Sequence, residues 1–137
     1  MAYFANRYAP NNEVYPRDAK HRAIVDRLMQ YDLNVLYRSL GDFLIPIVRQ
    51  GKMVTQMLNP VKEKKVTEAL SYIEAILSVH NFVAGDHLTL ADFSIYHSLE
   101  FAQEFKYDLS RYTLIWQWFK RTQTLIHQIN QYTDNIA

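Results

Sequence analysis

The segment at residues 85–101, GDHLTLADFSIYHSLEF, constrains the fold of this chain more than any other. Thr89 is a suitable helix N-cap, and the carboxylate of Asp92, three residues later, can accept the N-cap backbone N–H to complete a capping box. Residues 93–99 carry no formal charge. Because a helix that is apolar nearly all round must be buried on several sides, the segment predicts a central helix inside a bundle. Thr89 and Asp92 are interpreted as residues that start this helix, with no chemical role.

Residues 18–50 predict one long helix, with Asp18 as its N-cap and Gly51 directly beyond its end. Pro46 has no backbone N–H, and we expect it to kink the helix near Asp42. Helical spacing gives a main apolar stripe of Val25, Met29, Leu36, Leu40, Phe43 and Ile47. A second apolar strip beside it consists of Leu33, Tyr37, Leu44 and Val48. A helix with an apolar side of this width is either plain core or one wall of a pocket, and the spacing leaves both interpretations open.

The remaining chain also has helical spacing. Asn59 followed by Pro60 predicts the start of the next helix, and Ser110 is expected to cap a further one. No stretch alternates between apolar and polar residues as a half-buried strand would. The sequence therefore predicts an all-α bundle of five to six helices around a buried, capped central helix.

The composition of the 137 residues limits the kinds of partner that this chain binds. Fifteen basic and 14 acidic residues are interspersed and give a net charge of +1, so no basic patch indicates nucleic acid or an anionic membrane. There is no cysteine, which excludes disulfides and thiol chemistry and is compatible with a cytoplasmic location. No apolar run approaches the ~20 residues of a membrane-spanning helix.

Few residues indicate chemistry. The histidines show no metal-binding spacing, so no metal site is expected, and nothing orders Ser, His and Asp into a triad. His97 is interpreted as a hydrogen-bonded core histidine. Asp42 is expected either to form an ion pair with Arg38 or Arg49 or to face a pocket, and its position away from the main stripe favours the ion pair.

Three segments resemble the C-terminal domain of insect cytosolic glutathione transferases of the delta and epsilon classes: YAPNNEVYPRDAKHRAIVDRL, FVAGDHLTLADFSI and DLSRYTLIWQWF. The sequence departs from the family pattern at Thr113, where a proline is usual. The resemblance implies that residues 18–137 form the α-helical C-terminal domain and that 10–17 are the interdomain linker. Residues 1–9 would be the remnant of the last helix of a missing thioredoxin-like domain, with an exposed apolar face.

The segment LYRSLGDFLIPIVRQG most resembles the Noppera-bo branch of the epsilon class, which serves ecdysteroid biosynthesis and is thought to handle a sterol. In that branch an acidic residue of the long helix faces the hydrophobic-substrate site, and Asp42 matches it. A carboxylate in an apolar slot would favour a steroid that bears a hydroxyl. The resemblance further implies a substrate wall of Tyr37, Leu40, Gly41, Leu44, Ile45 and Val48, with Gly41 leaving room for the ligand.

Two functions remain open. The first is the substrate-binding half of a glutathione transferase that forms a homodimer at full length and takes glutathione as co-substrate. In this family the glutathione site and the catalytic serine belong to the missing domain, so no residue here is assigned as catalytic. We expect the chain alone to lack conjugating activity. The second is a non-catalytic interaction or assembly module of the same fold, for which the charged face at residues 62–68 could serve docking.

Overall fold

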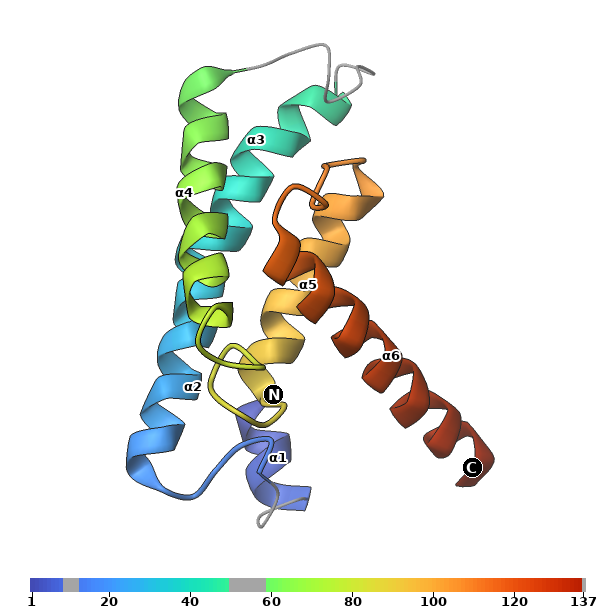
Figure 1. Ribbon diagram of the computed structural model, residues 1–137. Helices are drawn as coiled ribbons and strands as arrows, with labels where there is room; N and C mark the ends of the chain where they lie inside the picture. Colours follow the sequence, from blue (N-terminus) through green and yellow to red (C-terminus); the bar gives the residue numbers. More distant parts are fainter. Residues whose placement is uncertain (9–12, 50–58, 137) are drawn as a thin grey trace.

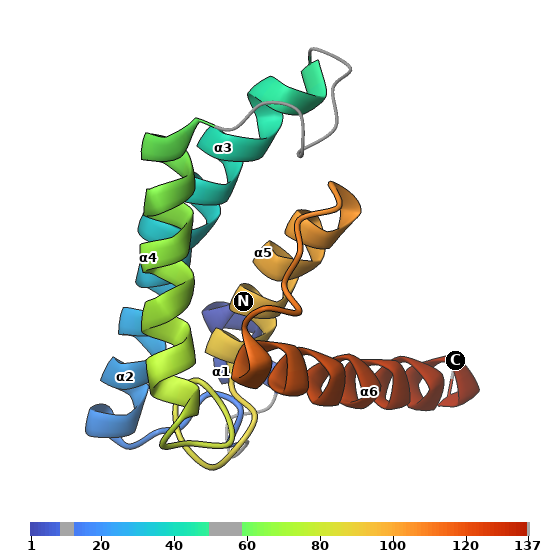
Figure 2. The same ribbon diagram turned by 45° about the horizontal axis from the view of Figure 1, so that its top comes forward.

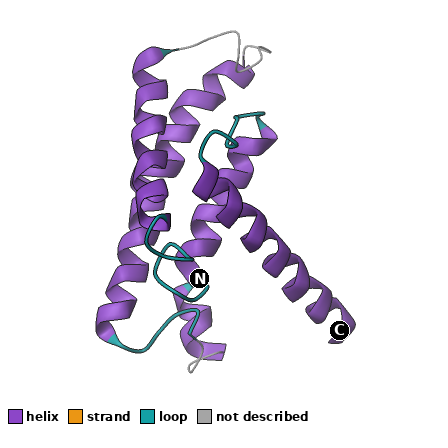
Figure 3. Ribbon diagram, in the orientation of Figure 1, coloured by secondary structure: helices purple, strands orange, loops and turns teal. Residues whose placement is uncertain are grey.

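The computed structural model describes residues 1–8, 13–49 and 59–136, and these residues fold into helices joined by turns and loops (Figures 1 and 3). Between Phe82 and Gly85 there is an isolated β-bridge, and no longer strand occurs in the described ranges. The expected all-α class is confirmed. The elements are α1 (Ala2–Tyr8), α2 (Ala19–Tyr31), the π-helix η1 (Asp32–Leu36), α3 (Tyr37–Arg49), α4 (Pro60–Leu77), α5 (Leu90–Glu104) and α6 (Thr113–Ile136).

Helix α5 lies at the centre of the bundle, as its sequence predicts. It contacts α2, η1, α3 and α6, while α3 and α6 also pack against α4. Its inward side chains are fully buried: Ala91, Asp92, Ile95, Leu99 and Ala102. The first half of α6 packs on the bundle through Trp118 and Phe119, and its second half projects away from the other helices (Figures 1 and 2).

The carboxylate of Asp92 holds the beginning of α5 in place. Its Oδ2 accepts hydrogen bonds from the backbone N–H of Thr89 at 2.8 Å and from the Thr89 hydroxyl at 2.9 Å. Its Oδ1 accepts from the backbone N–H of Val83 and from Nε1–H of Trp118, both at 2.9 Å. Burial raises the pKa of Asp92, while these hydrogen bonds act to lower it. The capping box is therefore also the junction between α5, the preceding loop and α6.

The expectation of one regular helix over residues 18–50 is wrong in one respect. The backbone widens into a π-helical turn at Asp32–Leu36, where the N–H of Tyr37 donates to the carbonyl of Asp32 five residues earlier. The predicted main stripe is buried on both sides of this turn, at Val25, Leu36, Leu40, Phe43 and Ile47. The second predicted strip divides: Leu44 is fully buried, whereas Leu33, Tyr37 and Val48 stay exposed. Apolar spacing does not predict the π-helical turn, because regular periodicity assumes an unbroken helix.

Besides Thr89, two further predicted helix caps are confirmed and one is wrong. The side chains of Asp18 and Asn59 accept backbone N–H groups at the beginnings of α2 and α4. The prediction for Ser110 is wrong, because its hydroxyl instead donates to Asp108 at 2.6 Å. The first N–H groups of α6 are satisfied by Glu74 of α4, whose two carboxylate oxygens accept from residues 114 and 115 at 2.9 and 2.8 Å. This cap comes from another helix, so the local sequence does not contain it.

Candidate functional site

The residues expected to form a substrate wall on α3 divide between two environments. Leu40 and Leu44 are fully buried in the core. Tyr37, Ile45 and Val48 each remain between 41% and 46% exposed. The ring of Tyr37 packs on Phe101 of α5 with the ring centroids 5.6 Å apart. The exposed members therefore form an apolar edge of α3 that faces outward beside α5, with the two leucines behind it.

A hollow of about 460 Å³ lies along this edge, and we call it the α3 hollow. It is lined by Leu33, Asn34, Tyr37, Arg38, Gly41, Asp42, Ile45, Pro46 and Lys62. The structure thus brings four of the predicted site residues together at one hollow, whereas Leu40, Leu44 and Val48 are not part of its lining. A Cβ added at Gly41 would lie 3.6 Å from Cδ1 of Ile45, which is ordinary van der Waals contact. A larger side chain there would occupy the hollow without a backbone clash.

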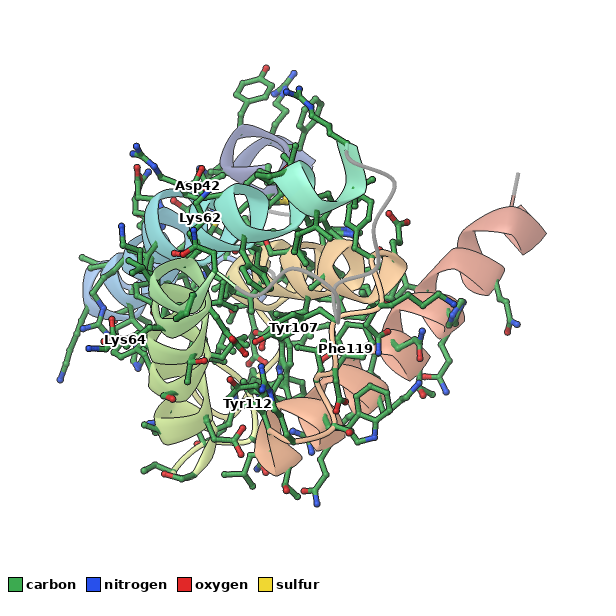
Figure 4. All side chains as sticks on the ribbon, turned by 90° about the horizontal axis from the view of Figure 1, so that it is seen from above. Asp42, Lys62, Lys64, Tyr107, Tyr112 and Phe119 are labelled. Atoms are coloured by element: carbon green, nitrogen blue, oxygen red, sulfur yellow. The ribbon has the colours of Figure 1, made fainter. Side chains whose placement is uncertain are left out.

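Lys62 is a member of the hollow that sequence reasoning missed. Because Pro46 has no N–H, the carbonyl of Asp42 four residues earlier lacks its usual helical donor. Nζ of Lys62, on α4, donates to that carbonyl oxygen at 2.9 Å, and Figure 4 shows the two residues side by side. The proline signals a free carbonyl in the sequence, but the lysine that satisfies it follows only from the packing of α4 on α3.

The carboxylate of Asp42 is exposed. No ion pair links it to Arg38 or Arg49 in the part of the chain that the structure describes. Asp42 lines the α3 hollow on one side and a second shallow hollow against α4 on the other, which it shares with Arg38, Lys65 and Glu68. This carboxylate is thus placed to accept a hydrogen bond from a ligand in either hollow.

A tyrosine pair from α2 and α4 lies at the second hollow, which Tyr31 lines. The rings of Tyr31 and Tyr72 pack with their centroids 4.5 Å apart. The Tyr31 hydroxyl donates to the carbonyl of Ala69 at 3.1 Å. Burial, with a smaller contribution from Tyr72, raises the pKa of Tyr31 to about 12. Tyr31 therefore stays a neutral hydrogen-bond donor at physiological pH.

A buried carboxylate between the π-helical turn and α5 also escaped prediction from the sequence. Asp32 lies in the π-helical turn with only 2% of its surface exposed, and its Oδ2 accepts from the Ser94 hydroxyl at 2.5 Å. Its Oδ1 has no hydrogen-bond partner in the described residues. Burial raises the pKa of Asp32, and the hydroxyls of Ser94 and Ser98 oppose that shift. Asp32 lies at helical spacing from Val25, Met29 and Leu36 of the main apolar stripe, so its position on the buried side was available from the sequence.

The prediction that His97 belongs to the core is wrong. Its side chain is 64% exposed, and its Nδ1 lies 3.2 Å from a carboxylate oxygen of Glu100. The apolar residues around it in sequence face inward from both sides of α5, and the imidazole occupies the remaining outer strip. Among the residues that the structure describes, no cluster of His, Asp and Glu could hold a metal ion.

The structure is an all-helical domain with a hollow on one outer helix edge. The family model described as "Glutathione S-transferase, C-terminal domain" matches residues 40–125. The chain belongs to this family. None of the described helices combines the length and the apolar character needed to cross a membrane.

Curated relatives and solved structures agree with this assignment. The chain is 31% identical over 121 residues to "Glutathione S-transferase D7" of Anopheles gambiae, covering 88% of this chain and 54% of the relative. It is 35% identical to a delta-class glutathione transferase of Nilaparvata lugens, with a TM-score of 0.81, covering 90% of this chain and 56% of the other. The chain is also 31% identical to the Bombyx mori glutathione transferase BmGSTD1, with a TM-score of 0.83. This match covers 93% of this chain and 57% of the other.

These relatives support the assignment of the chain to the C-terminal domain of insect delta-class glutathione transferases. An epsilon-class enzyme of the housefly, Musca domestica, is 29% identical with a TM-score of 0.74, covering 90% of this chain and 56% of the other. The epsilon class and its Noppera-bo branch therefore stay hypotheses. The chain spans about half the length of the curated relatives that it matches.

Proposed function

We propose that this chain is the substrate-binding domain of a glutathione transferase, with the hydrophobic substrate lying in the α3 hollow. The observation that carries the proposal is the exposed apolar edge of Tyr37 and Ile45 beside the carboxylate of Asp42, in a chain of this family. Small-molecule sites are commonly apolar with a few polar groups that orient the ligand. The domain contributes binding, while a thioredoxin-like domain holds glutathione and supplies the catalytic serine.

The proposed substrate is a hydrophobic molecule that bears a hydroxyl, such as a sterol of ecdysteroid biosynthesis. Asp42 would accept the hydrogen bond of that hydroxyl, and Gly41 would leave room for the ring system. A ligand that covers the Asp42 carboxylate removes the water that hydrogen-bonds to it. A hydrocarbon has no donor to replace those hydrogen bonds, so it would bind less well than a molecule with a hydroxyl. Leu40 and Leu44 would support the hollow from the core.

The remaining parts of the proposal follow the family resemblance. Residues 1–9 would end the thioredoxin-like domain, residues 10–17 would be the linker and residues 18–137 the helical domain. Met1, Tyr3 and Phe4 are all at least 60% exposed, which supports an apolar face of α1 available to that domain. The face of α2, α3 and α4 around Tyr31 and Tyr72 would contribute to a homodimer at full length. The proposed location is the cytoplasm.

Binding of dehydroergosterol, a fluorescent sterol with a free 3-hydroxyl, tests the proposal on the 137-residue chain. Asp42→Asn should weaken binding on the order of tenfold, since a hydrogen bond to a charged group is worth about 1.5–3 kcal/mol. The 3-O-methyl ether, which cannot donate, should bind weakly to both proteins. The control is Glu104→Gln, which removes an exposed carboxylate at the end of α5.

Equal affinities of the wild type for the sterol and its ether would contradict the role of Asp42. If neither sterol bound and the chain instead bound a protein saturably, the assembly-module alternative would replace the present proposal.

A further inference from the structure

The loop between α5 and α6, residues 105–112, contacts both α3 and α4, two of the elements that line the α3 hollow. We propose that Tyr107 and Arg111 of this loop are positioning residues for the α3 hollow, which hold α3 and α4 in the arrangement that ligand binding needs. The inference rests on the proposed function, because the ligand of the hollow is part of that proposal. Neither residue lines the hollow, so each would act through the residues that it contacts on the two helices.

Tyr107 links the loop to α3. Its side chain is buried, with 5% of the residue exposed, and its ring packs edge-to-face on Phe43 with the centroids 6.1 Å apart. Phe43 directly follows Asp42, which lines the α3 hollow. A shift of the Tyr107 ring would therefore move the part of α3 that carries the proposed hydrogen-bond acceptor for the ligand.

Arg111 joins Tyr107 to α4. Its Nη2 donates to the Tyr107 hydroxyl at 2.5 Å, and its Nη1 lies 3.9 Å from a carboxylate oxygen of Glu63. The guanidinium also lies over the rings of Tyr107 and Tyr112, 5.2 and 5.3 Å from their centroids, and Figure 4 shows both tyrosines beside α4. Glu63 directly follows Lys62, whose ammonium group donates to the backbone of α3 at the hollow. The arginine thus contacts α4 one residue away from the lysine that joins α4 to α3.

The Tyr107 hydroxyl stays protonated at physiological pH. Burial is the largest cause that raises the pKa of Tyr107 to about 12, while the hydrogen bond from Arg111 acts to lower it. Without Arg111, the hydroxyl would keep only its hydrogen bond with Tyr112. The ring would then lose the charged donor that fixes it against Phe43, and charged donors form the stronger hydrogen bonds.

The backbone of the loop is fixed at both ends. At its start, Lys106 has φ +63, a left-handed conformation that is unfavourable for a residue with a side chain. Its N–H donates to the carbonyl of Gln103 at 2.9 Å, and the N–H of Tyr107 donates to that of Ala102 at 3.0 Å. At the other end, Glu74 of α4 accepts the first N–H groups of α6. Strained backbone persists where the surrounding contacts hold it, and here the buried Tyr107 directly follows the strained residue.

A double-mutant cycle on the 137-residue chain, measured with dehydroergosterol and its 3-O-methyl ether, tests the proposal. The ratio of the two affinities reports the hydrogen bond to Asp42 and not binding in general. Arg111→Met and Tyr107→Phe should each reduce this ratio by about threefold or more, because a binding group displaced by a fraction of an ångström pairs poorly with its ligand. The double variant should reduce it no further, since the two side chains act as one unit.

The matched control is Arg121→Met, which should leave the ratio unchanged. Arg121 also lies over an aromatic ring, 5.3 Å from the centroid of Phe82, and donates to a backbone carbonyl, that of Asn81. None of these three residues lines the α3 hollow. Far-UV circular dichroism checks that the variants stay helical. If one unfolds, Lys106→Gly is added to every protein, because glycine adopts the left-handed conformation readily.

Hydrogen exchange of the ligand-free chain separates this proposal from the proposed function. Arg111→Met should speed amide exchange at Phe43 and Leu44 on the order of tenfold and leave that of α2 unchanged. If the wild type binds the sterol and its ether equally, the role of Asp42 fails, and hydrogen exchange alone decides whether the loop positions α3. The proposal is overturned if exchange in α3 does not change, if Arg121→Met speeds it as much, or if a wild-type preference for the sterol persists in full in both loop variants.

Discussion

Asp32 and Asp92 are both fully or almost fully buried, yet the two carboxylates differ in how many hydrogen bonds they accept. Asp92 accepts hydrogen bonds at both oxygens and joins three parts of the chain. Asp32 accepts a hydrogen bond from Ser94 at Oδ2, with the Ser98 hydroxyl nearby, and its Oδ1 has no hydrogen-bond partner in the described residues. A buried acceptor without a donor costs about 1–3 kcal/mol, and more if it is charged. At the scale of single residues, Asp92 thus stabilises the fold, while burial of the Asp32 Oδ1 without a donor destabilises it.

The first prediction concerns Asp32→Asn and the pH dependence of stability. Because burial raises the pKa of Asp32, the folded chain holds the proton more tightly than the unfolded chain does. The resulting stabilisation is fully present below the unfolded pKa, near ~3.9, and is lost as pH rises through the folded value. An asparagine does not titrate and can still accept from Ser94. Urea unfolding should therefore show the variant gaining stability relative to wild type between pH 4 and pH 7.

The control for this experiment is Asp42→Asn, which replaces an exposed carboxylate on the same helical segment. A stability difference between Asp32→Asn and wild type that stays constant over that pH range would show that Asp32 does not titrate as its burial indicates.

At the scale of elements, helices in this bundle complete each other's backbone hydrogen bonds. Glu74 of α4 accepts the first N–H groups of α6, and Lys62 of α4 donates to the carbonyl that Pro46 frees in α3. Helix α4 therefore stabilises α3 near its middle and α6 at its beginning. Isolated peptides of α3 or α6 would lack these partners, which is one reason why helices depend on tertiary packing.

A double-mutant cycle tests the link between Lys62 and Pro46. Lys62→Met keeps the aliphatic chain but removes the donor, and it should lower the free energy of unfolding by about 1 kcal/mol. Pro46→Ala restores a backbone N–H to the carbonyl of Asp42. In that background, Lys62→Met should cost much less, because the helix itself then satisfies the acceptor.

Lys64→Met is the matched control for this cycle, since Lys64 is 77% exposed and lies 3.8 Å from Glu68 on the outer face of α4. It should change stability by no more than about 0.5 kcal/mol. If Lys62→Met lowered the free energy of unfolding equally in the wild type and in the Pro46→Ala variant, the proposed link would be refuted.

At the scale of the whole molecule, hollows lie along different parts of one bundle. The α3 hollow opens on an outer helix edge, while another hollow, lined by Lys20, Val25 and Val83 among others, is walled by the loop that Asp92 fixes. Exposed apolar side chains remain on α1 and at Ile129 on the projecting half of α6. Since the chain matches about half of its curated relatives, its proposed enzymatic role depends on a second domain.

The prediction at this scale is that the purified 137-residue chain does not conjugate glutathione to 1-chloro-2,4-dinitrobenzene. The reason is chemical, since a glutathione thiol is a poor nucleophile until a neighbouring group lowers its pKa, and the proposed serine belongs to the other domain. The assay follows product absorbance, with a full-length delta-class transferase as positive control. Glutathione-dependent turnover above the uncatalysed rate would refute the assignment of the catalytic group to the other domain.

Much of this fold could be predicted from the sequence, because it depends on local interactions. Asp18, Asn59 and Thr89 begin their helices as expected, because a cap depends on residues within three positions of each other. The apolar character of α5 predicted its central position for a similar reason, since burial on all sides requires apolar residues on all sides. The all-α class followed from the same spacing.

The candidate site was predictable only in part. Tyr37, Gly41, Asp42 and Ile45 meet at the α3 hollow, whereas Leu40 and Leu44 are buried in the core. Lys62 joined the hollow, and Glu74 took the role expected of Ser110, through contacts between segments 20 to 41 residues apart. The sequence by itself determined where most helices begin and which helix is central. Tertiary structure decided which residues of the second strip stay exposed and which distant side chains satisfy the free backbone groups of α3 and α6.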